Sequence, residues 1–393
     1  MALQRSYGKR IYISVFIDAF GWELLERHSF LDDLLVTKAP LQTVLGYSST
    51  CIPTILTGAP PREHGHFAFF RYTPDASPFG HLGRLLGALP AFVEERARVR
   101  HWISRGLQAI FGWDGYFQIY NTPFEHLEFL DYSEKRDLYM PFGINGGQKT
   151  LFDRLHDKGV PFHVSNWRLS EEANLSRLAR ALDGADIEFA YLYLAAMDGL
   201  LHAEGTGSAQ VAVKVAWYER KLRDIVALAH RRYRDVVLSV FSDHGMTDTR
   251  ETSNLMLRVE ALDLRYGLDY AAVYDSTMAR FWFMTERARR RIVALLTTED
   301  RGRVLAHSEL VELGVDFENH EYGELIFLMD PGVLICPSFM GRQPIAGMHG
   351  FHPNDKDSVA MFASSETPPV LPQRLTDLHD VLLDGAIHVG RRQ

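Results

Sequence analysis

Residues 46–66 read GYSSTCIPTILTGAPPREHGH, and the rest of the chain is organised around this stretch. Three hydroxyl side chains, Ser48, Ser49 and Thr50, precede an apolar helical run that stops near Gly58. The positive field at a helix N-terminus stabilises a deprotonated hydroxyl and binds phosphate. The stretch is therefore a candidate site for a nucleophile that faces a phosphate. The simpler alternative is that Ser48 or Ser49 only caps the helix.

The composition is that of a globular chain, with 393 residues, 46% of them hydrophobic, and a net charge of -8. This length suits one large α/β domain with inserted segments, or two domains. No long basic block is present, which argues against binding of a nucleic acid polymer. Two cysteines, Cys51 and Cys336, do not make a disulfide framework and indicate a reducing compartment. The N-terminal apolar run ends after about seven residues, so we expect a cytoplasmic protein without stable membrane insertion.

Apolar strands alternate with amphipathic helices along most of the chain. Strand patterns occur at residues 11–17, 160–164, 187–195, 236–241 and 359–363. Helical patterns occur at residues 21–35, 50–57, 150–158, 169–182, 208–233 and 372–383. Continuously apolar strands that alternate with helices are typical of parallel sheets with both faces covered. The sequence thus predicts an α/β fold, a mostly parallel sheet with helices on both faces and inserted cap segments.

Two segments interrupt this rhythm. Residues 67–148 are rich in aromatic residues and contain two amphipathic stretches, whereas residues 256–345 combine alternating strands with a helical pattern at 286–296. We predict that the first segment is an insertion that forms a lid, and that the second is a small α+β cap. The predicted core then consists of residues 11–66, 149–255 and 346–386. For the insertion, surface helices with only a packing role are the alternative.

Carboxylates and imidazoles follow the buried strands, at the edge where open α/β sheets bind ligands. They are Asp18, Asp198, His202, Asp243, His244 and His349. Each one alone has an ordinary explanation, such as a helix cap or a turn, but their recurrence at one sheet edge is hard to explain as coincidence. Asp and His without Cys suit Zn²⁺, with Mn²⁺ as second choice. The set exceeds the needs of one ion and predicts two, which would clamp the attacking and leaving oxygens of a phosphoryl displacement.

The motifs around these residues, together with MDGLLH, SDHGM and GMHGFHP, resemble the alkaline phosphatase superfamily. Within it they are most similar to the type I phosphodiesterase/nucleotide pyrophosphatase branch, over residues 11–383 and least in the insertion. The resemblance implies two metal sites, one formed by Asp198, His202 and His349 and the other by Asp18, Ser48, Asp243 and His244. It also implies that Ser48, ten residues before Gly58, is the nucleophile, with Ser49 and Thr50 as fallback choices.

The activity that the resemblance implies is that of a two-metal phosphoesterase, phosphodiesterase-like or nucleotide-pyrophosphatase-like, with a phosphoseryl intermediate. Its substrate would be a small nucleotide or lipid-like phosphate ester. That branch commonly has Thr as nucleophile with an Asn shortly after it, whereas Ser48 stands here and no Asn follows closely. A phosphomonoesterase, a phosphoryl mutase or transferase, or a non-catalytic binding protein on the same scaffold therefore stays open. Cys51 also resembles the start of a sulfatase signature, but Ile55 occupies its Arg position. The sequence does not indicate an oligomeric state.

Overall fold

The computed structural model describes residues 8–89, 96–144 and 147–387, and its centre is a sheet of six strands. The strand order is β2-β16-β7-β1-β6-β5, in which β7, β1, β6 and β5 are parallel and β16 is antiparallel to both of its neighbours. The bounds are β1 (Gly8–Ile17), β2 (Thr37–Leu41), β5 (Phe162–Val164), β6 (Phe189–Leu194), β7 (Tyr233–Phe241) and β16 (Ala360–Ser364). The predicted α/β class with a mostly parallel sheet is confirmed.

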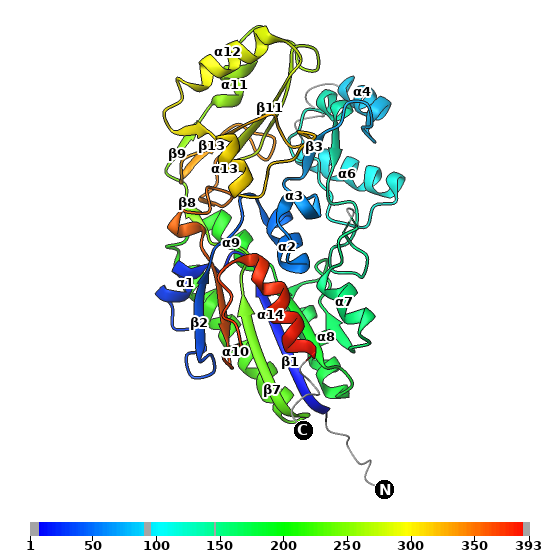
Figure 1. Cartoon of the computed structure of the whole chain (residues 1–393), viewed down its shortest axis with the longest axis vertical. Coiled ribbons are helices and arrows are strands. Elements are labelled where there is room, and N and C mark those ends of the chain that lie inside the picture. The colour runs from blue at the N-terminus through cyan, green and yellow to red at the C-terminus, as the bar shows by residue number, and fades with distance from the viewer. Residues whose placement is uncertain (1–7, 90–95, 145–146, 388–393) are drawn as a thin grey trace.

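Helices cover both faces of this sheet, because successive side chains of a strand point to opposite faces. On β1, Ile11 and Ile13 belong to one hydrophobic cluster, whereas Tyr12 and Phe16 belong to the other. The first face packs against α1 (Trp22–Arg27), α8 (Glu171–Gly184), α9 (Ala196–Glu204) and α10 (Ala209–His230). The second face packs against α2 (Ser48–Thr57), α7 (Leu151–Asp157) and α14 (Leu375–Ile387), as Figure 1 shows.

The helix predicted over residues 21–35 is too long. It ends at Arg27, and His28 already has an extended backbone. Phe30 and Leu31 are nevertheless fully buried, and Leu31 takes a positive φ of 49°. The apolar pattern that predicted a helix therefore reflects a buried irregular segment, since burial alone produces the same pattern.

The insertion and the cap lie together over the carboxyl ends of the core strands (Figure 1). A short helix, α3 (Pro61–His64), precedes the insertion, which contains β3 (Phe70–Tyr72), α4 (Gly80–Gly87), α6 (Ala97–Phe111), η1 (Phe124–Phe129) and β4 (Leu130–Tyr132). The cap has an antiparallel sheet in the order β10-β11-β13-β12. Its strands are β10 (Tyr270–Tyr274), β11 (Met278–Phe283), β12 (Gly302–Val304) and β13 (Leu325–Met329), and its helices are α11 (Leu255–Glu260), α12 (Glu286–Leu296) and α13 (His307–Glu312).

Short pairings lie where the chain enters and leaves the cap. β9 (Glu251–Ser253) of the core pairs with β14 (Val333–Ile335) of the cap, and β8 (Thr247–Asp248) pairs with β15 (Gly347–Met348) within the core; η2 (Lys356–Ser358) precedes β16. One hydrophobic cluster contains both Phe70 and Tyr132 of the insertion and Tyr274 and Phe281 of the cap. The two segments therefore form one layer with a shared core. Within the described ranges, no helix is long and apolar enough to cross a membrane.

Candidate active site

The first cluster of predicted metal ligands forms where β1 and β7 end. Asp18 follows β1, and Asp243 and His244 follow the adjacent β7. Nε2 of His244 lies 3.1 Å from Oδ2 of Asp243 and 3.8 Å from Oδ1 of Asp18. All three side chains are buried, and their ligand atoms lie within 4.8 Å of one another. The parallel register of the two strands thus brings these residues together.

The second cluster joins α9 to the loop after β15. Asp198 and His202 lie one turn apart on α9 and so share a face of this helix. Oδ1 of Asp198 lies 3.2 Å from Nε2 of His202 and 3.5 Å from Nε2 of His349. The rings of His349 and His244 stack with their centroids 3.7 Å apart, so the two clusters are adjacent. The structure therefore brings the six predicted Asp and His ligands into one bipartite site.

Hydrogen bonds orient the imidazoles of both clusters. Nδ1–H of His202 donates to the carbonyl oxygen of Gly347 at 2.8 Å, and Nδ1–H of His244 donates to that of Gly245 at 2.9 Å. With the proton on Nδ1, each Nε2 keeps its lone pair for a cation. Such backbone bonds to the second nitrogen are the usual support of a histidine that binds a metal.

The carboxylates of the site have oxygen atoms without protein donors. Oδ1 of Asp18, Oδ2 of Asp243 and Oδ1 of Asp198 are buried and have no hydrogen-bond partner in the described structure. The other oxygen of Asp18 accepts from the hydroxyl of Tyr193 at 2.5 Å. The sequence did not single out Tyr193, because it approaches Asp18 only when β6 pairs with β1. Unpartnered buried oxygens beside imidazole lone pairs fit a set of ligands for divalent cations.

Without bound metal ions, the pKa shifts in the site also indicate that its carboxylates lack nearby positive charge. Burial raises the pKa of Asp18 well above its usual range, and the charges of Asp243 and Asp198 raise it further. Burial lowers the pKa of His349 well below its ordinary value, and His244 acts in the same direction. A bound cation favours an ionised carboxylate and a neutral imidazole, which are the forms that bind metals.

We therefore expect divalent cations to stabilise the protein strongly. Addition of Zn²⁺ or Mn²⁺ to metal-free protein should raise the melting temperature, with a gain of about 2.7 kcal/mol per site at a hundredfold excess over Kd. Titration calorimetry should count two equivalents, and Asp198→Ala should remove one of them. Asp300→Ala is the matched control because it also removes a carboxylate, but one whose side chain is 96% exposed and belongs to neither cluster. Two equivalents retained in Asp198→Ala would contradict the assignment.

Of the three hydroxyls at the start of α2, Ser48 contacts a predicted ligand. Its Oγ lies 3.0 Å from Nε2 of His244. Ser49 Oγ is buried without a hydrogen-bond partner in the described structure, and the hydroxyl of Thr50 donates to the carbonyl of Phe67. Ser48 is thus in the best position among the three to attack a bound phosphorus. Cys51 is only 1% exposed and packs toward the sheet, so it does not present the accessible side chain that a sulfatase needs.

A chain of hydrogen bonds from the cap reaches both parts of the site. The hydroxyl of Thr277 donates to the carbonyl of Gly350 at 2.8 Å, and the hydroxyl of Tyr47 donates to Oγ1 of Thr277 at 2.8 Å. These directions follow because a Thr hydroxyl has one hydrogen. Tyr47 precedes Ser48, and Gly350 follows His349. Thr277 therefore positions the candidate nucleophile relative to the second cluster.

Thr277→Val should test this positioning role, because Val keeps the shape of Thr but has no hydroxyl. The hydroxyl of Tyr47 would lose its acceptor and the carbonyl of Gly350 would lose this donor, so the free energy of unfolding should fall by about 1–3 kcal/mol. We expect kcat to fall more than KM rises, since the groups that move are the reacting ones. Thr277→Ser keeps the hydroxyl and should retain most of both quantities. Equal kcat values for the Val and Ser variants would contradict the role.

A cavity of about 520 Å³ opens beside both clusters and is lined by Asp18, Ser48, Asp198 and His349. Its further walls come from the insertion and from the cap. They include Phe69, Tyr116, Tyr120, Glu134, Asp275, Leu334, Ile335 and Met340. Among the described residues that line it there is no Lys or Arg. The site therefore faces a mostly aromatic and aliphatic pocket.

The sheet, the two Asp/His clusters at its carboxyl edge and the hydroxyl at a helix N-terminus define a phosphoester hydrolase of the alkaline phosphatase class. A family model described as type I phosphodiesterase / nucleotide pyrophosphatase matches residues 12–352, and the chain belongs to this family. The family consists of metal-dependent phosphoesterases that act on small nucleotide phosphate esters. The family assignment from the sequence is confirmed.

Solved structures of ectonucleotide pyrophosphatase/phosphodiesterase 5 share the fold. An inactive murine form in complex with AMP is 15% identical, with a TM-score of 0.68 over 96% of this chain and 95% of that chain. Another murine structure is 16% identical, with a TM-score of 0.67 over 96% and 94% of the two chains. The human protein is 15% identical, with a TM-score of 0.65 over 96% and 94%. No curated protein matches the sequence.

Proposed function

We propose that this protein is a two-metal phosphodiesterase in which Ser48 is the nucleophile. The observation that carries the proposal is the 3.0 Å contact between Oγ of Ser48 and Nε2 of His244, at the N-terminus of α2 and at the wall of the cavity. A hydroxyl among predicted metal ligands and beside a pocket has the surroundings that a nucleophile needs. Zn²⁺ is the first choice of cation for the Asp and His ligands, and Mn²⁺ is the second.

In the proposed reaction, Oγ of Ser48 forms a bond to phosphorus while the bond from phosphorus to the leaving oxygen breaks. The hydroxyl proton leaves Ser48 in this step, and the departing alcohol takes up a proton. The phosphorus of this phosphoseryl intermediate still carries the second organic group of the diester. Water then attacks it, the bond from phosphorus to Oγ breaks, and a phosphate monoester is released as Ser48 regains its proton. Ser48 is the first residue of α2, so the positive field of this helix N-terminus would stabilise the developing negative charge. Bound divalent cations would supply Lewis acidity, which acidifies hydroxyl groups and neutralises phosphoryl oxygens.

The walls of the cavity favour a diester over a monoester. A phosphodiester carries a second organic group, for which the aromatic and aliphatic side chains of the insertion and cap provide contacts. The murine relative in complex with AMP, which shares the fold, also supports an organic phosphate ester as the ligand class. A monoester dianion would gain little from a pocket whose described lining contains no Lys or Arg.

The test is turnover of bis-p-nitrophenyl phosphate beside p-nitrophenyl phosphate, on metal-free protein titrated with Zn²⁺ or Mn²⁺. We expect kcat/KM for the diester to exceed that for the monoester by at least about tenfold, and activity to require two metal equivalents. Faster monoester turnover would instead favour a phosphomonoesterase or a phosphoryl mutase or transferase on the same scaffold.

A further inference from the structure

The outer face of α6 is basic and carries an exposed tryptophan. Trp102 is 73% exposed, and the exposed Arg98 and Arg105 lie four residues before it and three residues after it. Residues at these spacings share one face of a helix, so the tryptophan stands between two arginines on this face. The helix contains no Asp or Glu. Figure 1 shows α6 at the outer edge of the insertion.

The charge of this face has no acidic partner among the described residues. Within the described ranges, neither Arg98 nor Arg105 forms an ion pair, whereas Arg84 of α4 pairs with Glu128 at 2.8 Å. The chain as a whole has a net charge of -8, so the basic face does not reflect a general excess of positive charge. An unpaired basic face on an acidic protein is complementary to an anionic partner.

A second helix shows that exposed arginines alone do not make such a face. α12 also exposes Arg287 and Arg290, but none of its large hydrophobic side chains is exposed, and Glu286 stands in its first turn. α6 by contrast exposes Ile110 as well as Trp102, the former by 69%. Large apolar side chains beside basic residues on an exposed helical face are typical of helices that lie in a membrane interface.

The inner face of α6 holds the helix against the rest of the insertion. Arg100 is buried, and its guanidinium donates to the carbonyls of Tyr120 and Thr122 at 2.9 and 2.7 Å. Oγ of Ser104 accepts from the backbone N–H of Ile119 at 3.1 Å. The side chains of the outer face take no part in these bonds. They can therefore be substituted without loss of the contacts that fix the helix.

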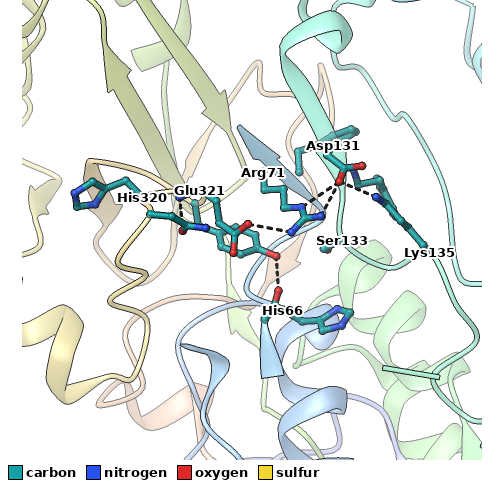
Figure 2. A network of polar contacts seen from close by, with 12 residues as sticks. His66, Arg71, Asp131, Ser133, Lys135, His320 and Glu321 are labelled. Carbon is teal, nitrogen blue, oxygen red and sulfur yellow. Dashed lines mark hydrogen bonds and ion pairs between the residues drawn. The ribbon is translucent and has the colours of Figure 1, made fainter. Parts of the chain in front are cut away.

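A polar network fixes the insertion to the cap (Figure 2). Arg71 of β3 binds Asp131 of the adjacent β4 at 2.7 Å and Glu321 of the cap at 2.9 Å. Lys135 reaches the same Asp131 carboxylate, as Figure 2 shows. The insertion thus presents α6 in an orientation that is set before a partner binds, which reduces the entropic cost of docking.

We propose that the outer face of α6 binds the surface of membranes that contain anionic lipids. Its arginines would bind lipid phosphates, and the indole of Trp102 would lie at the level of the headgroups with Ile110 beside it. Binding of this kind requires no membrane-spanning helix. An acidic protein or a nucleic acid would also attract the arginines, but only a lipid surface offers an apolar phase for both Trp102 and Ile110. The binding does not depend on catalysis by Ser48.

Co-sedimentation of the full chain with lipid vesicles tests the proposal. Vesicles of phosphatidylcholine alone are compared with vesicles of equal parts phosphatidylcholine and phosphatidylglycerol. We expect at least about tenfold tighter binding to the anionic vesicles, with a loss of affinity at high salt. Arg98→Gln with Arg105→Gln should weaken this binding by about 25-fold, since each basic residue near such a surface contributes a factor of about five.

The matched control for the arginines is Arg287→Gln with Arg290→Gln on α12. It removes the same charge from an exposed helix without an exposed large hydrophobic side chain. Its effect on vesicle binding should stay within about twofold, because charges more than a Debye length from the membrane are screened.

Trp102 provides a second measurement. Brominated phosphatidylcholine in the anionic vesicles should quench part of the tryptophan emission of the wild-type protein, because bromine quenches rings that lie in the lipid. Trp102→Phe keeps an apolar ring, so it should bind within about threefold of the wild-type protein but lose this quenching. Trp102→Gln should weaken binding by at least about tenfold, since it removes the largest apolar side chain of the face.

Five results would overturn the proposal. They are equal binding to both kinds of vesicle or to neither, equal losses in the α6 and α12 variants, no quenching of wild-type emission, unchanged quenching in Trp102→Phe, and binding of single-stranded DNA that is tighter than vesicle binding and lost in the α6 variants. The last result would assign the face to nucleic acid. The wild-type measurements decide even if a variant fails to fold. Failure of the proposed function leaves all of them unaffected, because none involves turnover.

Discussion

Replacing Ser48 with Ala is expected to reduce kcat by a factor on the order of 10⁴ or more, because it removes the atom that attacks phosphorus. Metal content should persist, since three Asp or His ligands remain in each cluster. The measurement is steady-state turnover of bis-p-nitrophenyl phosphate, together with metal analysis of the same sample. Rapid acid quenching of the wild-type protein during turnover, followed by mass spectrometry, should find a p-nitrophenyl phosphoryl group on the peptide that contains Ser48.

Two matched variants make this result specific. Ser49→Ala changes the next residue, whose hydroxyl is buried and forms no hydrogen bond in the described structure, so it should retain most activity. Ser48→Thr keeps a hydroxyl and should retain measurable turnover, because a threonine is the usual nucleophile of the family that the sequence resembles. If Ser48→Ala kept full activity and Ser49→Ala lost it, Ser49 and not Ser48 would be the nucleophile.

The parts of the fold that could be predicted are those whose sequence pattern reflects local structure. The apolar run at 236–241 lies within β7, and the helical pattern at 286–296 coincides with α12. The helix at 21–35 was predicted too long, because a buried loop around Leu31 has the same apolar spacing. The shared core of insertion and cap joins residues such as Phe70 and Phe281, and no local pattern reveals such distant contacts.

The residues of the candidate site also fall into those that the sequence could predict and those that it could not. Asp18 and Asp243 could be singled out because each follows a buried strand, and parallel strands end at the same edge of a sheet. Tyr193 and Thr277 could not, since each contacts a partner that only folding brings near. Sequence patterns thus single out the residues that we propose to carry the chemistry, whereas the residues that orient them are found only in the structure.

Replacing Arg280 with Met is expected to be among the most destabilising single changes in the cap. Arg280 is fully buried on β11, and its guanidinium binds Asp275 at 2.9 Å and the carbonyl of Phe70 on β3 at 2.9 Å. Met fills much of the same volume but leaves the Asp275 carboxylate buried and unpaired. Breaking a buried ion pair in this way costs about 3–5 kcal/mol. Urea denaturation should therefore show a much lower midpoint for Arg280→Met.

Two further variants separate the lost ion pair from the lost packing. Arg287→Met removes an exposed arginine that pairs with Asp263, and its effect should stay within about 0.5 kcal/mol, since surface pairs contribute little. The double variant Arg280→Met with Asp275→Asn removes the unpaired charge and should recover much of the loss. No recovery would attribute the effect to packing between β11 and β3. Because Asp275 also lines the cavity, recovery of stability without recovery of turnover would assign this pair a second role in shaping the substrate pocket.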